Sequence, residues 1–134
     1  MGSWDEGIMG GDTPWDILGC IEDVIGGSVT AQQINDHLDD ILNIIHEKQE
    51  YGEIWSRKDR RTFSQVVGFQ IVTSGAKFPA RLKNRVIKAC ESEILDCKND
   101  KTDWLRPGKR INRLESFIKD VQRYNGKPLK IRET

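Results

Sequence analysis

Long apolar runs are absent from the sequence, and since the longest spans only a few residues, a membrane-spanning helix is excluded. The first residues also lack the basic-then-apolar layout of a signal peptide, because the earliest charges are Asp5 and Glu6. Cysteine is scarce and odd in number, and Cys90 and Cys97 would lie about 10 Å apart along one helix, too far for a disulfide. We therefore expect a cytoplasmic protein with reduced thiols.

Histidine is also nearly absent. His37 and His46 are nine positions apart, so they would point to opposite sides of one helix and could not share a metal ion. The cysteines, including Cys20, lie on or beside apolar stripes, where free thiols usually pack and remain inert. No His-Glu-x-x-His or phosphate-binding glycine motif is present. We expect no cofactor and no metal, and we favour a non-enzymatic protein over an enzyme.

The net charge is also zero, but acidic and basic residues are distributed unequally between the two halves of the chain. Residues 1–54 contain twelve Asp and Glu against one base, Lys48, whereas residues 55–134 contain twenty Lys and Arg against nine Asp and Glu. The halves therefore carry charges of −11 and +11. Such a division either serves a charged partner or is neutralised inside the fold. We favour internal neutralisation, because a domain of this size is too small for its halves to fold apart.

Apolar residues at helical spacing are abundant, and they predict a single all-α domain of about five helices across the whole chain. The first helix is the best marked: Thr13 is expected to cap it, Pro14 suits its first position, and Asp16 completes a capping box. Asp12 and Asp16 also complement the positive end of the helix dipole. Gly26-Gly27 should end the helix.

Four further helices are expected, at about residues 30–51, 62–75, 79–97 and 111–124, and either Thr62 or Ser64 could start the third helix of the chain. Thr30 with Gln33 should cap the second, and segment 55–61 should be its tail and a link, because bases suit a helix C-terminus. The third helix is apolar on nearly all sides, which marks it as central, although its β-branched residues leave a strand as the alternative. Trp104-Leu105 should be an apolar anchor, and Pro107-Gly108 a turn.

The chain ends are expected to be irregular, because glycines at positions 2, 7, 10 and 11 give residues 1–11 a freedom that a helix does not tolerate. Trp4 and Ile8-Met9 are too apolar to be left in water, so this lead should lie on the core, with a free terminus as the alternative. Gly10-Gly11 precede a helix start that could offer N–H groups to an anion, but the neighbouring acids would repel one, so we interpret the segment as structural. Residues 127–134 should form a loose tail.

The opening combines Met-Gly-x-Trp, a glycine, and an acidic turn into a helix. The residues of this pattern are Met1-Gly2-Ser3-Trp4, Gly7, Asp12, Asp16 and Ile17-Leu18. They resemble the opening of an uncharacterised family, domain of unknown function 4259, and an apolar helix ending at Gly75 before Pro79, with Trp104 ahead of the last helix, is similar in order. The chain departs from the family pattern at Asp5, Gly11 and Ile17. The resemblance implies a small helical fold and a bacterial or phage accessory context, and it carries over no activity.

Three aspartates on the expected second helix form a candidate acidic face. Asp36, Asp39 and Asp40 are spaced i, i+3 and i+4, so their carboxylates share one face and could hold a hard cation such as Mg²⁺. No calcium-loop motif accompanies them, and an acidic helix face is usually just solvated. We interpret it as a partner-binding face, with a metal-dependent enzyme as the third hypothesis for function.

Basic residues gather in the later half. The candidate face for a partner or phosphate consists of Arg81, Arg85, Lys88, Arg106, Arg110 and Arg113. Bases at the start of a helix oppose its dipole, so they indicate an anionic neighbour, either phosphate or the acidic half of the chain. The isoelectric point of about 6.7 argues against a dedicated nucleic-acid binder.

Together these features predict a non-enzymatic, charge-polarised interaction protein that binds a protein partner. Its most concrete form, by analogy with the family, is a bacterial or phage accessory protein that inhibits a defence or nuclease system. Opposite-charge faces also allow a homo-oligomer. The alternative is a small binding protein for a nucleotide or other phosphorylated ligand, held by Arg and Lys of the fourth and fifth helices.

Overall fold

A computed structural model of the protein describes residues 7–46 and 56–131, and the statements below concern these residues. Its helices are α1 (Asp12–Ile25), α2 (Ala31–Leu42), the short 3₁₀ helix η1 (Asn43–His46), α3 (Arg57–Ser74), α4 (Ala80–Lys98) and α5 (Pro107–Arg123). The described ranges contain no strand, so the all-α prediction is confirmed and the strand alternative for α3 is wrong. In the same ranges, no helix combines the length and apolar character needed to cross a membrane.

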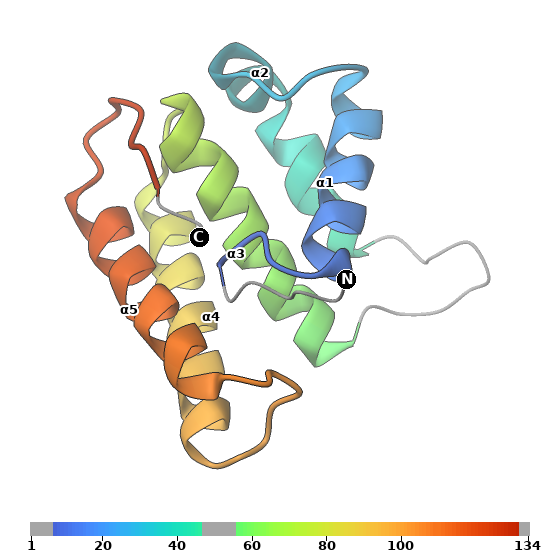
Figure 1. Ribbon diagram of the computed structural model, residues 1–134. Helices are drawn as coiled ribbons and strands as arrows, with labels where there is room; N and C mark the ends of the chain where they lie inside the picture. The colour runs from blue at the N-terminus through green and yellow to red at the C-terminus, as the bar shows by residue number, and fades with distance from the viewer. Residues whose placement is uncertain (1–6, 47–55, 132–134) are drawn as a thin grey trace.

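Helix α3 is the centre of the fold. It lies between the α1–α2 pair on one side and the α4–α5 pair on the other (Figure 1). Val66, Ile71 and Val72 of α3 are fully shielded from solvent, which confirms the prediction of a central helix. Gly68 lets α4 approach closely, because a Cβ at this position would lie 2.7 Å from Cγ1 of Val86.

Helix α1 begins two residues earlier than expected, at Asp12 instead of Pro14. Gly11 is its N-cap, with φ 91°, and no side chain caps the helix, so the predicted Thr13 cap and Asp16 capping box are wrong. A backbone conformation with positive φ of this size is favourable only for glycine, which explains why Gly11 occupies the position. Asp12 in the first turn does complement the dipole, and left-handed Gly26 ends the helix as predicted.

Helix α3 begins five residues before the expected start, so the placement of residues 55–61 as a tail of the second helix is wrong for the described part of that segment. The Ser56 hydroxyl caps α3 by accepting a hydrogen bond from the N–H of Asp59 at 3.1 Å. Asp59 itself offsets the bases in the first turn. Acids outside the helix offset them further, because Lys58 and Arg61 both form ion pairs with acidic residues beyond α3.

The other helix ends agree with the sequence in part. Thr30 caps α2 as predicted, because its hydroxyl accepts a hydrogen bond from the N–H of Gln33 at 3.2 Å. The α-helix ends at Leu42 and η1 follows it, while the remainder of the expected second helix lies outside the described residues. Helix α5 begins at Pro107, so the expected turn there is wrong; a proline suits the first helical position because it has no N–H to leave unpaired.

Both described ends of the chain lie on the core. Ile8-Met9 are buried, which confirms that the lead rests on the helices, and Trp4 lies outside the described residues. At the other end, the N–H of Leu129 donates to the C=O of Val72 at 2.7 Å. Leu129 and Ile131 also pack against the core, so the described part of the expected loose tail contacts the helices.

Two large aliphatic residues of the helices face solvent. Leu95 is 59% exposed and Val24 is 37% exposed. Successive helical positions are rotated by about 100°, so Ile94, which is buried, takes the inward place and turns Leu95 outward.

Candidate functional site

Helices α3, α4 and α5 meet at a buried polar group of side chains, which we call the Arg110 cluster: Gln65, Glu93, Trp104 and Arg110. Arg110 is 2% exposed and Glu93 is 5% exposed. The Nε and Nη2 atoms of Arg110 donate to the two carboxylate oxygens of Glu93 at 2.7 and 2.9 Å, which is a bidentate pair. A buried charge is tolerated only when it is paired. Since Glu93 belongs to α4 and Arg110 to α5, this pairing links the two helices.

The remaining hydrogen bonds complete the Arg110 cluster. Gln65 Nε2 donates to Glu93 Oε1 at 2.8 Å, and Trp104 Nε1 donates to Glu93 Oε2 at 2.9 Å, so each carboxylate oxygen accepts two hydrogen bonds. Arg110 Nη2 also donates to Gln65 Oε1 at 3.0 Å. Arg110 Nη1 donates to the C=O of Gly7 at 2.7 Å, which ties the N-terminal lead to the core.

The electrostatics of Glu93 are those of a structural carboxylate. Burial alone would raise its pKa, but the hydrogen bonds and positive charge of Arg110, with the hydrogen bond from Gln65, lower the pKa below its ordinary value. Glu93 is therefore ionised at neutral pH. It has no proton to donate as a general acid near pH 7, and both of its carboxylate oxygens already accept hydrogen bonds within the cluster.

Two charged residues of the Arg110 cluster stand within apolar stripes of the sequence, and helical spacing alone did not identify them as a buried pair. Gln65 and Glu93 were not recognised, and Arg110 was assigned to the basic face, whereas the structure places it in the core. Arg110 stands four residues before Leu114 and therefore on the buried stripe of α5. Glu93 stands three residues after Cys90 on the buried stripe of α4. A charged residue inside an apolar stripe predicts a buried, paired charge.

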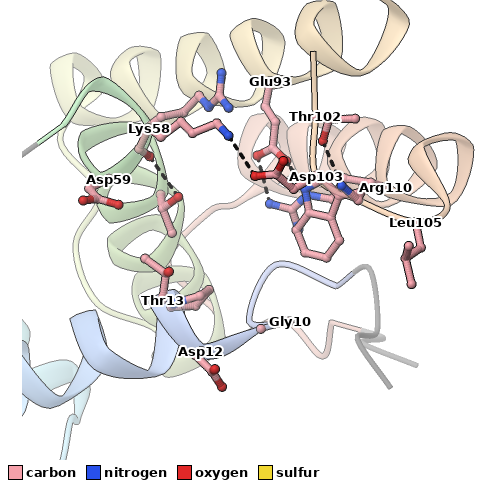
Figure 2. Close-up of a pocket in the computed structure, with 15 residues that line it drawn as sticks. Gly10, Asp12, Thr13, Lys58, Asp59, Glu93, Thr102, Asp103, Leu105 and Arg110 are labelled. Atoms are coloured by element: carbon pink, nitrogen blue, oxygen red, sulfur yellow. Dashed lines mark hydrogen bonds and ion pairs between the residues drawn. The ribbon is translucent and has the colours of Figure 1, made fainter. Parts of the chain in front are cut away.

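A cavity of about 540 Å³ opens beside the Arg110 cluster. The end of the lead, the first turn of α1, the start of α3 and the connection between α4 and α5 surround it (Figure 2). Glu93 and Arg110 form part of its wall, together with Lys58, Arg61 and Trp104. The cavity therefore has a buried charged cluster on one side and two basic residues of α3 on another.

The two basic residues from α3 form ion pairs of different kinds. Lys58 Nζ lies 3.2 Å from Asp103 in an exposed pair, whereas Arg61 Nη1 lies 2.6 Å from Asp96 in a partly buried one. The hydrogen bond from Arg61 lowers the pKa of Asp96 below its ordinary value, against the opposing effect of burial. Arg61 Nε is shielded from solvent and has no hydrogen-bond partner in the described part of the chain.

Trp104 acts as an anchor, as predicted, but Leu105 does not. The guanidinium carbon of Arg110 lies 4.5 Å from the centre of the Trp104 ring, in a cation–π contact. The indole is therefore held both by this contact and by its hydrogen bond to Glu93. Leu105 is 82% exposed at the edge of the cavity.

The predicted acidic face is exposed and does not form a metal site. Asp36 accepts two hydrogen bonds from Gln32, at 2.9 and 3.0 Å, and Asp40 lies 3.7 Å from His37. Asp39 is also exposed, but the backbone of His37 departs from helical geometry, with φ −119° and ψ 18°, so a kink in α2 separates Asp36 from Asp39 and Asp40. Among the described residues, no group of three or more His, Cys, Asp or Glu side chains is arranged to hold a metal ion, so the metal hypothesis for this face has no support.

The predicted basic face is divided by the fold. Arg81, Arg85 and Lys88 are exposed on α4, Arg106 is exposed at the start of α5, and Arg113 is half-buried. None of these five is among the residues that line the cavity. The exposed bases of α4 therefore lie outside the cavity, whereas Lys58 and Arg61 of α3 line it.

The two oppositely charged halves do not neutralise each other through direct ion pairs among the described residues. Each described pair joins two residues of the same half: His37–Asp40 in the acidic half, and Lys58–Asp103, Arg61–Asp96, Arg110–Glu93 and Arg123–Asp120 in the basic half. The expected internal neutralisation therefore does not occur by side-chain pairing in this part of the chain.

The thiols are poorly suited to catalysis. Burial raises the pKa of Cys90 to about 12, and burial also raises the pKa of Cys97. Cys20 is exposed, but burial of its thiol and the charges of Asp23 and Asp16 raise its pKa as well. Since the thiolate is the reactive form, all three are weak nucleophiles at neutral pH.

No family model, curated protein or solved structure matches the chain. The resemblance to domain of unknown function 4259 therefore stays a prediction, and function has to be inferred from the surfaces and the cavity of the protein itself.

Proposed function

We propose that the protein is a non-enzymatic interaction protein that binds a protein partner through its charged faces. The observation that carries this proposal is the separation of charge between the two described parts of the chain, which no ion pair between described residues bridges. Residues 7–46 contain seven Asp and Glu and no Lys or Arg, whereas residues 56–131 contain nineteen Lys and Arg against eight Asp and Glu. These two segments form opposite sides of the molecule, because α1 and α2 cover one side of α3 while α4 and α5 cover the other (Figure 1).

The exposed side chains on each side are available for a partner. Asp36, Asp39 and Asp40 are exposed on α2, and within the described residues none of them pairs with Lys or Arg. Complementary surface charge raises the rate of association and selects the partner, and it does so most strongly at low salt. The acidic face of α2 therefore suits a partner with a basic surface, and the face that contains Arg81, Arg85 and Lys88 suits an acidic one.

The test is capture of a partner with matched charge variants. Immobilised wild-type protein should retain a stoichiometric partner from an extract of the source cell, and increasing salt should release it. The triple variant Asp36→Lys, Asp39→Lys, Asp40→Lys should lose this partner. The matched control, Glu91→Lys, Asp100→Lys, Glu115→Lys, makes the same change in net charge at exposed positions elsewhere and should keep it.

A partner that is retained equally by the wild type, the acidic-face variant and an Arg81→Glu, Arg85→Glu, Lys88→Glu variant would show that neither face is used. A role in inhibiting a defence or nuclease system is the more specific form of the proposal. It rests on the family resemblance and would be supported if the captured partner were a component of such a system.

A further inference from the structure

We propose that the cavity beside the Arg110 cluster binds a small organic anion, that is, a carboxylate or phosphate ester attached to a flat apolar body. This site is separate from the charged faces described above, so either proposal can fail without the other. The volume of about 540 Å³ falls within the range of small-molecule sites in proteins. The wall of the cavity combines basic and aromatic side chains, which is the composition that such a ligand requires.

The first step of the inference is the position of the basic groups. Lys58 and Arg61 are three residues apart at the start of α3, so they share one face of the helix. Both line the cavity. Among the described residues, the ammonium group of Lys58 pairs with Asp103, whose side chain is 96% exposed. Exposed pairs of this kind contribute little to stability, so an anionic ligand can replace the Asp103 carboxylate at Lys58.

The second step is the unused hydrogen-bonding capacity of Arg61. Its described hydrogen bonds all come from Nη1, which donates to Asp96 at 2.6 Å and to Ser92 at 3.5 Å. Nε is buried and has no acceptor in the described part of the chain. Native proteins rarely leave a buried donor unpaired, and the planar guanidinium matches a carboxylate or phosphate. A small reorientation of the guanidinium toward a ligand oxygen would supply the missing acceptor.

The third step concerns the acids around the cavity, which would otherwise repel an anion. Glu93 is neutralised by Arg110 through its bidentate pair. Figure 2 shows Lys58 reaching toward Asp103, whereas the carboxylates of Asp12 and Asp59 point away from this pair. The anion is therefore expected at the α3 wall and not at the start of α1, where the acids of the first turn disfavour it.

The fourth step is the apolar part of the ligand. Trp104 presents an aromatic ring to the cavity, and buried Pro14 and exposed Leu105 add apolar surface nearby. Trp104 is already held by Glu93 and Arg110, so little side-chain freedom is lost when a ligand binds against it. A flat apolar body can pack against this ring while its acidic group reaches Lys58 and Arg61.

The experiment is calorimetric titration at low salt with three probes: phenyl phosphate, benzoate and inorganic phosphate. Saturable binding of phenyl phosphate or benzoate is expected, and the tighter of the two identifies the acidic group. Lys58→Ala should weaken that binding by at least about tenfold, because it removes a charged donor. Asp103→Asn should strengthen it by roughly two- to fivefold, because it removes the competing carboxylate.

The control is Lys77→Ala, which removes an exposed lysine beyond the opposite end of α3 and should leave binding unchanged. Melting curves of all variants establish that they fold. No saturable binding of either organic probe at millimolar concentration would overturn the proposal. It would also be overturned if inorganic phosphate bound as tightly as phenyl phosphate, or if Lys77→Ala and Lys58→Ala had the same effect.

Discussion

The Arg110–Glu93 and Lys58–Asp103 pairs line the same cavity but lie in different surroundings. Arg110–Glu93 is buried and bidentate, and Gln65 adds two hydrogen bonds: its amide NH₂ donates to Glu93, and its amide oxygen accepts from Arg110. Lys58–Asp103 is exposed and consists of a single contact of 3.2 Å. The first pair has no capacity left for a ligand, whereas the second can exchange its partner. Burial therefore decides which charge is structural and which is available for binding.

The largest expected effect comes from breaking the buried pair. Arg110→Met should lower the free energy of unfolding by about 3–5 kcal/mol, because it leaves the Glu93 carboxylate buried without a cation. Urea unfolding would measure the loss. The double variant Arg110→Met, Glu93→Leu should recover much of it, because no unpaired charge remains. A loss of less than about 1 kcal/mol for Arg110→Met would mean that this buried pair contributes no more to stability than an exposed one, which would contradict its structural role.

A smaller loss is expected when the cluster keeps its charges but loses one donor. Trp104→Phe retains an aromatic ring beside Arg110 but removes the N–H that donates to Glu93. We expect a decrease of about 1–3 kcal/mol in the free energy of unfolding, measured by urea titration. Trp15→Phe is the matched control, because Trp15 is 60% exposed, and this variant should unfold like the wild type.

The contribution of the buried Arg110–Glu93 pair to the free energy of unfolding should be lost at acid pH and not near neutral pH. The folded state lowers the pKa of Glu93, so its contribution is present above the unfolded pKa of about 4.3 and is lost as the pH falls through the lower, folded value. The free energy of unfolding of the wild type should therefore decrease below about pH 4 more steeply than that of Glu93→Gln. Parallel curves for the two proteins would argue against this role of Glu93.

The smallest effect is expected at the exposed pair. Lys58→Ala should change the free energy of unfolding by less than about 1 kcal/mol, and this change should decrease as salt is added. Chemical denaturation at low and high salt would measure both. A loss as large as that of Arg110→Met would show that Lys58 is part of the structural framework, and its proposed role as a ligand contact would then need another explanation.

The helices themselves were predictable because their signals are local. Apolar spacing identified all five, Thr30 was recognised as a cap, and Gly26 and Gly75 were recognised as ends. The start of α3 was not predicted correctly because Ser56, Thr62 and Ser64 can each cap a helix. Contacts of Lys58 and Arg61 with acids beyond the helix favour the earliest start, and those contacts are not visible in a local pattern.

By itself, the sequence determined that this protein is helical, that its charge is divided and that α3 is central, because each of these follows from the spacing or composition of neighbouring residues. Only the tertiary structure decided which charges are buried together. Arg110 bonds to Gly7, 103 positions away, and to Gln65, 45 positions away. The packing of α3, α4 and α5 brings these groups together, and helical periodicity specifies a face of one helix but not its partner on another.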